Sequence, residues 1–427
     1  MSTSYHPLVR DLYDFAHRTD DRHQDFCQAI VSARNPDHGG KLEMDQEHIE
    51  RLEGYFRFCD NLLKWVPRVD TTGDELLQKL LVFYWVFNQP QLSKYQTQIT
   101  PESAGTDPTW LSYWQVLFAR ELGFFLGTKE SACGISSFYQ NENYNQEADL
   151  WQDPPKGGWV SFNQWFAREW KDIDVARPLQ LEDMEDNVVV SAADSKFGGH
   201  FPVEQGGVVL QEKVLNIKGI VWPIEKLLEG VPKVENFNGG SFMHAFLSPS
   251  DYHRQHAPVS GTVVMAKVIQ ELVYLQVTPD RGEARLAPDR GLLVKKPLVN
   301  RMILTDIAAG SGKKLKDLLG DDGIATLDIN APDEPGYQWC QTRGLIVIET
   351  PDHGRVAVLP VGMAQVSSVV LLVEQGQQVE KGDQISYFQF GGSDIVLVFE
   401  NPVDYSVELD HKCNIRTRIA TFQSPSS

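Results

Sequence analysis

The pattern of apolar residues changes near residue 185, and this change limits the folds that the chain can adopt. In the first 150 residues, apolar side chains recur at three- and four-residue steps, which places them on one face of a helix. Beyond residue 185, short β-branched runs alternate with Gly, Pro, Asp and Asn, as in strands joined by turns. These runs cover residues 188–190, 261–269, 272–277, 301–307, 344–349, 355–361, 368–373 and 395–399. The pattern predicts an α+β protein, with a helical N-terminal domain followed by a β-rich domain of the sandwich or barrel kind.

Start and stop signals divide the helical part. One stripe consists of Ile49, Leu52, Phe56, Cys59, Leu62 and Val66, and Pro67 ends that helix. Thr72 and Glu75 form a capping box before the next apolar run. A further stripe covers 111–125 and ends near Gly127. The aromatic residues of these stripes either line a ligand pocket or form core, and core is the favoured interpretation.

Turn-forming residues at 152–158 predict a domain boundary, which gives domains at 1–155 and 156–427. A short amphipathic helix with its own capping box is predicted immediately afterwards, at 161–168. Residues 314–319 are expected to form one helical turn among the strands.

Charge and cysteine content exclude several classes of protein. There are 58 acidic and 39 basic residues, a net charge of −19 that repels phosphate backbones and anionic lipids. We therefore expect no nucleic-acid partner and no membrane, although solubility alone explains such a charge. Five cysteines without a close pair argue against a disulfide framework or zinc site. With no signal-like N-terminus or long apolar run, the expected location is the cytoplasm.

The sequence Gly391-Gly392-Ser393 precedes an apolar strand and offers a chemical possibility beyond an ordinary turn. Two glycines permit a tight backbone that bulkier residues cannot adopt. In such a turn the Ser393 hydroxyl can attack the Gly392 carbonyl carbon and convert the peptide into an ester. Elimination then cuts the chain, and loss of ammonia leaves a pyruvoyl group at residue 393. A tripeptide alone also matches by chance, so the ordinary turn stays open.

Two histidines, His253 and His256, lie three residues apart in a segment closed by Pro258. A serine nucleophile needs a base such as histidine, and the base needs an orienting carboxylate. Asp194, which follows a run of three valines, can supply that carboxylate. Three interpretations stay open for the histidines: structural residues, catalytic residues, or metal ligands, the last without a third and fourth ligand at recognisable spacing.

Several ordered motifs between about 160 and 410 resemble the phosphatidylserine decarboxylase family. The histidine segment at 252–258 resembles the family's His motif, and residues 391–394 match its Leu-Gly-Ser-Thr cleavage motif at the central Gly-Ser. Further motifs fit at 162–168 with 177–178, at 362–366, and at 376–383 with 388–390. Two departures are Gly391 in place of Leu and Asp394 in place of Thr, and Asp394 puts the cleavage rate in doubt.

The resemblance implies a role for each residue. Ser393 becomes the pyruvoyl group, and Gly391 and Gly392 shape the scissile bond. His256 and Asp194 complete the triad for self-cleavage, and His253 serves decarboxylation as the substrate-side acid/base. The self-made pyruvoyl ketone acts as an electron sink, so that pyridoxal phosphate and metal are not needed.

The implied function is that of a carboxy-lyase made as a zymogen. The helical N-terminal layout is similar to the soluble branch of the family, which includes the tryptophan decarboxylase of psilocybin biosynthesis. The expected substrate is therefore a free amino acid, with an aromatic one as the candidate, and the chain's own small fragment is an expected partner. Two alternatives stay open: a peripheral phosphatidylserine decarboxylase, and a non-cleaving binding protein on the same scaffold.

Overall fold

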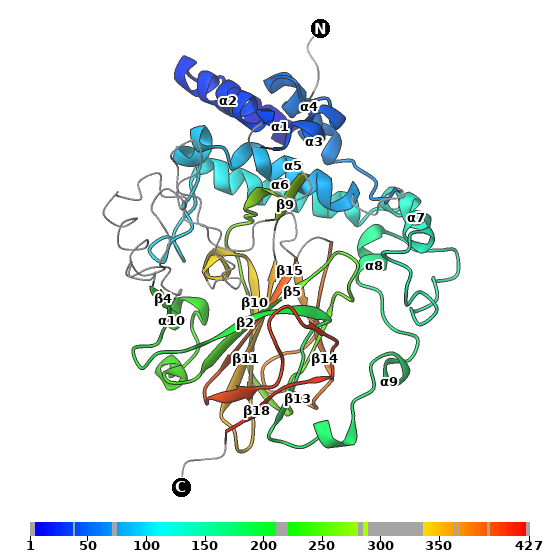
Figure 1. Cartoon of the computed structure of the whole chain (residues 1–427), viewed down its shortest axis with the longest axis vertical. Coiled ribbons are helices and arrows are strands. Elements are labelled where there is room, and N and C mark those ends of the chain that lie inside the picture. The colour runs from blue at the N-terminus through cyan, green and yellow to red at the C-terminus, as the bar shows by residue number, and fades with distance from the viewer. Residues whose placement is uncertain are drawn as a thin grey trace, which may run out of the picture.

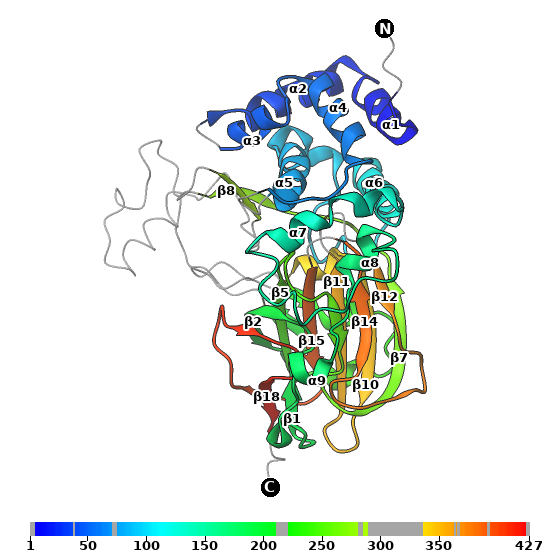
Figure 2. The ribbon, with the colours of Figure 1, turned by 90° about the vertical axis from the view of Figure 1, so that its right-hand side faces the viewer.

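The computed structural model describes residues 5–36, 39–70, 75–210, 221–280, 285–288, 336–362, 364, 368–390 and 393–423. Helices from the first third of the chain form a layer at one end of the molecule, and a curled antiparallel sheet forms the other end (Figures 1 and 2). The α+β prediction is confirmed. Residues 301–307 and 314–319, for which a strand and a helical turn are predicted, lie outside the described residues.

The helices begin and end close to the predicted signals. The stripe that Pro67 was expected to stop forms α4, and Gly127 caps α6. Ser161 caps α8 by accepting a hydrogen bond from the Gln164 amide. Thr72 lies outside the described residues. The α-helices are α1 (Pro7–Ala16), α2 (Asp20–Ala33), α3 (Lys41–Gln46), α4 (Leu52–Leu62), α5 (Glu75–Phe87), α6 (Trp110–Leu126), α7 (Ser136–Gln140), α8 (Phe162–Phe166), α9 (Ile173–Ala176) and α10 (Ile224–Leu227), with 3-10 turns η2 (Pro90–Tyr95), η3 (Glu130–Gly134), η4 (Leu181–Asp183), η5 (Val234–Phe237) and η7 (Tyr337–Cys340).

Antiparallel pairing builds the β part. The largest sheet has the order β13-β7-β10-β11-β15-β5-β2-β17, and smaller sheets have the orders β1-β18-β16, β12-β14-β6, β3-β4 and β8-β9. The strands are β1 (Val188–Val190), β2 (Ser195–Pro202), β3 (Val208–Leu210), β4 (Val221–Pro223), β5 (Ser241–Leu247), β6 (Arg254–His256), β7 (Gly261–Ile269), β8 (Val277–Asp280), β9 (Arg285–Pro288), β10 (Arg343–Glu349), β11 (Arg355–Gly362), β12 (Val369–Leu371), β13 (Gln378–Val379), β14 (Gln384–Phe388), β15 (Ser393–Phe399), β16 (Val403–Tyr405), β17 (Lys412–Cys413) and β18 (Arg418–Phe422).

The predicted strand at 272–277 is wrong for all but its last residue, where β8 begins. Its backbone is used to join the helical layer to the sheet. The Tyr84 hydroxyl of α5 donates to the Val273 carbonyl at 3.3 Å, and the Val277 amide donates to Asn88 at 2.7 Å. Side chains satisfy these backbone groups, so they are not available to a sheet ladder.

Strand β15 lies in the middle of the large sheet, between β11 and β5. Successive side chains on a strand point to opposite faces. Ile395, Leu397 and Phe399 pack into a core cluster that also contains the residues of the helical layer, whereas Val396 and Val398 pack into a second cluster on the other face. The helices and the first face of the sheet therefore share one continuous core.

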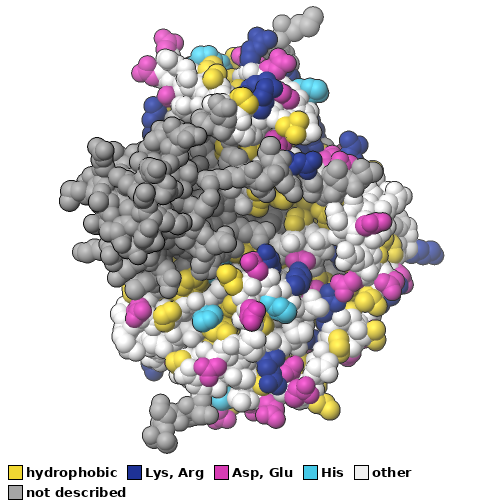
Figure 3. All heavy atoms as spheres, viewed as in Figure 1, with side chains coloured by type: hydrophobic (Ala, Val, Ile, Leu, Met, Phe, Trp, Pro, Cys, Tyr) yellow, Lys and Arg dark blue, Asp and Glu magenta, His cyan; other side chains and the backbone are white. Residues whose placement is uncertain are grey.

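Charged side chains of both signs are interspersed over the face shown in Figure 3. In the described part of the chain, no helix has the length and hydropathy needed to cross a bilayer.

Candidate active site

Ser393 is the first residue of β15, two residues before the predicted start of that strand. It pairs with Gly362 on β11 and with Leu247 on β5, and its side chain is only 2% exposed. Among the residues that the structure describes, none forms a hydrogen bond with its hydroxyl oxygen Oγ. Gly391 and Gly392 lie outside the described residues. A buried, unengaged hydroxyl at the start of a central strand is suited to act as a nucleophile, because no existing hydrogen bond has to break first.

Asp394 faces the opposite side of the sheet from Ser393. Tyr337 donates a hydrogen bond to its Oδ2 atom, and Gln338 Nε2 donates to the same atom at 3.2 Å. His244 Nδ1 lies 3.8 Å from that oxygen. All four side chains are buried within the sheet's second face or at its edge. Nothing in the local sequence indicated this cluster, because η7 is more than 50 residues away along the chain.

His253 is fully buried, and its ring stacks on Phe166 of α8 with centroids 3.8 Å apart. Within the described part of the chain, neither ring nitrogen has a hydrogen-bond partner of normal geometry. Burial lowers the pKa of His253 well below its usual range, and the nearby Arg168 cation lowers it further. Backbone groups of Asp251 and Ser248 oppose this lowering of the pKa, and Ser248 follows Leu247, the residue paired with Ser393. His253 is therefore a neutral imidazole close to the start of β15.

His256, at the end of β6, is held by two partners. Its Nδ1 atom lies 2.7 Å from the Gly382 carbonyl, and Tyr252 Oη lies 3.3 Å from Nε2. A carbonyl only accepts, so Nδ1 carries the proton and Nε2 keeps its lone pair. Burial lowers the pKa of His256 to about 4, against the opposing effect of the Gly382 carbonyl. His256 is consequently neutral at pH 7 and able to act as a base.

Asp194 is bound to Arg177 rather than to His256. Arg177 Nη2 donates to Asp194 Oδ2 at 2.6 Å, and the Ile415 amide donates to Oδ1 at 2.8 Å. Glu147 holds the other side of the guanidinium at 2.7 Å. The carbonyl of Gly382, not a carboxylate, thus occupies the orienting position on His256. The role of Asp194 in cleavage stays a prediction.

Helical residues cover this site. Phe390, three residues before Ser393, packs against Phe162 and Phe166 with ring centroids 5.3 and 5.5 Å away. Trp65, which follows α4, contacts the same ring edge-on at 6.3 Å. Phe390 therefore packs against both α8 and the residue that follows α4.

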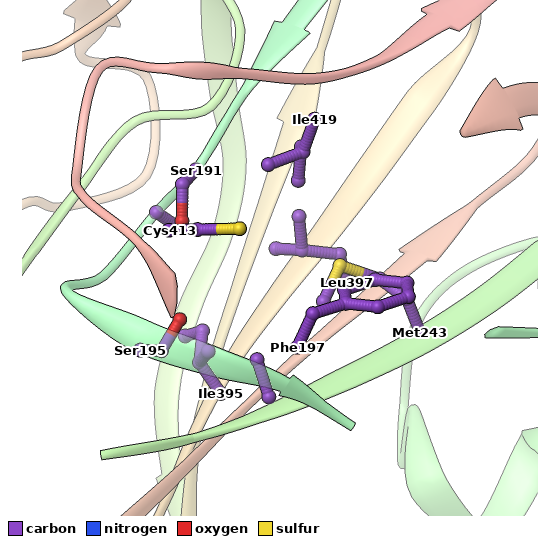
Figure 4. Close-up of a pocket in the computed structure, with 10 residues that line it drawn as sticks. Ser191, Ser195, Phe197, Met243, Ile395, Leu397, Cys413 and Ile419 are labelled. Carbon is purple, nitrogen blue, oxygen red and sulfur yellow. The ribbon is translucent and has the colours of Figure 1, made fainter. Parts of the chain in front are cut away.

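A cavity lies two residues further along β15 and is drawn in Figure 4. Its volume is about 10 Å³, enough for roughly one water molecule. Apolar side chains including Phe197, Met243 and Leu397 form most of its lining. It is too small for an amino acid and belongs to the core.

Among the described residues, no group of three or more His, Cys, Asp or Glu side chains is placed to hold a metal ion.

A family model described as phosphatidylserine decarboxylase matches residues 162–421, more than half of the chain. The chain belongs to the phosphatidylserine decarboxylase family. The family match begins at α8, so it contains Arg168, Asp194, both histidines and Ser393, and it leaves out the helices before α8.

Relatives in this family carry different decarboxylase names. The chain is 29% identical over 270 residues to phosphatidylserine decarboxylase proenzyme 3 of Schizosaccharomyces pombe, covering 63% of this chain and 22% of that protein. It is 28% identical over 299 residues to decarboxylase iboD of Amanita muscaria, covering 65% of this chain and 73% of that protein. It is 24% identical over 248 residues to an L-tryptophan decarboxylase of Psilocybe cubensis, covering 58% and 47%. The chain spans only 22% and 36% of two phosphatidylserine decarboxylase proenzymes, from S. pombe and Oryza sativa.

Proposed function

We propose that this chain is a pyruvoyl-dependent decarboxylase of a free amino acid, which matures by cutting itself between Gly392 and Ser393. The observation that carries the proposal is the buried Ser393 hydroxyl, without a hydrogen-bond partner, at the head of β15 near a neutral histidine. Relatives named proenzymes support a maturation step.

The proposed cleavage uses only groups of this chain. A neutral histidine, assigned to His256, takes the hydroxyl proton as Ser393 Oγ attacks the Gly392 carbonyl carbon. The peptide C–N bond breaks and an ester forms. Removal of the Ser393 α-proton then breaks the Cβ–Oγ bond, which leaves a carboxylate on Gly392 and dehydroalanine at 393. Addition of water releases ammonia and leaves the ketone.

The site fits the group that this reaction makes. Its ketone withdraws electrons from a bound amino acid as carbon dioxide leaves. Ser393 is buried, and aromatic and aliphatic side chains surround the site, which keeps water from the reacting carbon. His253 is assigned to return a proton to that carbon, because its two ring nitrogens have no hydrogen-bond partner.

A free amino acid fits the covered site better than a phospholipid headgroup does. Ser393 and His253 are buried under residues of α8 and the N-terminal helices, so a ligand has to enter between these elements. A small ligand needs less opening than a headgroup still attached to a bilayer. The L-tryptophan decarboxylases among the relatives support an aromatic substrate, and we expect the enzyme to act in the cytoplasm.

Phosphatidylserine decarboxylase activity is the second candidate, because the family and several relatives carry that name. Release of carbon dioxide from a panel of twenty free amino acids is compared with release from phosphatidylserine in liposomes. Turnover of one or a few free amino acids supports the proposal. Turnover only of the lipid, with co-sedimentation of the protein, favours the second candidate, and turnover of none contradicts both.

A further inference from the structure

Arg168 is a buried cation whose N–H groups are not all used. It follows α8 by two residues, is 3% exposed, and lies between two indole rings. The guanidinium carbon is 3.9 Å from the ring centroid of Trp151 and 4.8 Å from that of Trp165. Among the described residues, the Nε and Nη1 atoms have no hydrogen-bond partner, and neither does the buried Trp165 Nε1. Three donor nitrogen atoms, two of Arg168 and one of Trp165, are thus without an acceptor at this buried positive charge.

The two carboxylates whose charge acts on Arg168 are each bound by another cation. Asp194 is bound by Arg177 at 2.6 Å, and Asp251 is bound by Lys412 at 2.5 Å. The negative charges of both carboxylates still raise the pKa of Arg168. Burial lowers the pKa of Arg168 to about 10, so the side chain keeps its charge at neutral pH. A buried charge without a bonded anion costs free energy, and the indole faces offset part of that cost.

The position of Arg168 connects it to the candidate active site. Phe166, two residues earlier, stacks on His253, and the intervening Ala167 carbonyl accepts from Arg254 Nε at 2.6 Å. The positive charge of Arg168 lowers the pKa of His253. An anion held by Arg168 would therefore lie in the same buried region as the imidazole assigned to protonation.

We propose that Arg168, with the indole N–H of Trp165, binds the carboxylate of the α-amino acid substrate. This inference rests on the proposed function and extends it, because it names the residues that distinguish an amino acid from its amine product. Both a free amino acid and a serine headgroup carry this carboxylate, so the inference holds for either substrate class. Guanidinium and indole N–H groups are the donors that a carboxylate accepts from.

The chemistry predicts an unusual kinetic signature. The carboxylate loses its charge as carbon dioxide leaves, so Arg168 stabilises the bound substrate more than the transition state. Replacing Arg168 should raise KM at least tenfold and leave kcat unchanged or raised, by no more than about threefold. Replacement by Met removes the charge and keeps an apolar chain between the indoles, so stability should not fall. A purely structural Arg would show the reverse, with lower stability and an unchanged KM.

The closing experiment measures binding without requiring activity. Calorimetric titrations use Ser393→Ala protein, with and without Arg168→Met, and two probe pairs: L-tryptophan with tryptamine, and glycerophosphoserine with glycerophosphoethanolamine. We expect at least one carboxylate probe to bind tenfold or more tightly than its amine, and Arg168→Met to abolish that preference. Arg120→Met, at an exposed position of α6, is the matched control and should change neither affinity.

Three outcomes overturn the inference: a preference for the carboxylate that survives Arg168→Met, an equal loss of affinity for glycerophosphoserine and glycerophosphoethanolamine, and no binding of either carboxylate probe. The second would assign Arg168 to the phosphodiester. Failure of the wild-type chain to cut itself contradicts the proposed function instead, and the binding result with Ser393→Ala does not depend on it.

Discussion

Asp394 follows Ser393 directly, yet its carboxylate is bound on the other face of β15 by Tyr337 and Gln338. The departure from the family's Thr therefore does not place a negative charge against the Ser393 hydroxyl. Instead, Asp394 ties the head of β15 to η7.

Asp394→Asn is expected to cleave within about threefold of the wild-type rate, because the amide oxygen can still accept from Tyr337. Asp394→Leu removes the carboxylate oxygen that accepts from both Tyr337 and Gln338, and it should cost about 1–3 kcal/mol of stability. Cleavage rates are measured by denaturing gel, and stability by urea unfolding in a Ser393→Ala background. A large acceleration in Asp394→Asn would show that the charge does act on the serine.

We expect the two histidines to act in different steps, His256 in self-cleavage and His253 in decarboxylation. His256→Ala is expected to slow self-cleavage at least a hundredfold, because the assigned base is lost. His253→Ala is expected to mature and then decarboxylate at least a hundredfold more slowly. Appearance of the small fragment and release of carbon dioxide are followed in parallel. The exposed His200→Ala is the control for both assays. Normal turnover by His253→Ala would contradict the role assigned to His253, and normal cleavage by His256→Ala would contradict the role assigned to His256.

Stability should fall between pH 6.5 and about 4 because of His256. Its pKa is about 4 in the folded protein and about 6.5 when unfolded, so over this interval only the unfolded chain binds the proton. At pH 4.5 the loss attributable to this group is roughly 2 to 3 kcal/mol. Urea unfolding of Ser393→Ala at pH 7 and 4.5 is compared with the same protein carrying His256→Gln. An identical pH dependence in the two proteins would contradict the neutral, buried imidazole.

The Arg177–Asp194 pair should matter for stability. Asp194→Asn leaves a buried guanidinium with one weaker partner and is expected to cost about 3 kcal/mol. Glu147→Gln, on the half-exposed side of the same guanidinium, should cost less than about 1 kcal/mol. Cleavage of Asp194→Asn is measured at a temperature where the protein stays folded. A wild-type cleavage rate there would limit Asp194 to a structural role, against the triad prediction.

Local patterns predicted much of this molecule. Local sequence signals set the ends of two helices, predicted at Pro67 and Gly127, and the bounds of two strands, predicted at 261–269 and 395–399. The observed ends lie within a few residues of these predictions. The strand predicted at 272–277 failed because side chains of Tyr84 and Gln341 take backbone groups of Val273 and Tyr274.

Partners distant in sequence could not be predicted. Tyr337 meets Asp394 across 57 residues, and Gly382 meets His256 across 126. Such pairs depend on sheet register, which no local pattern fixes. Asp194 was assigned to His256 from its position after a run of valines and from the family resemblance, whereas the fold places it beside Arg177, 17 residues away.

The most direct test of the central claim is the intact mass of the purified chain under denaturing conditions. Self-cleavage predicts a large fragment ending at Gly392 and a 35-residue fragment covering 393–427, lighter by one ammonia than the same peptide beginning with serine. Ser393→Ala should stay whole. A wild-type chain that remains a single species of 427 residues after prolonged incubation would contradict the proposed maturation and the pyruvoyl-dependent reaction that depends on it.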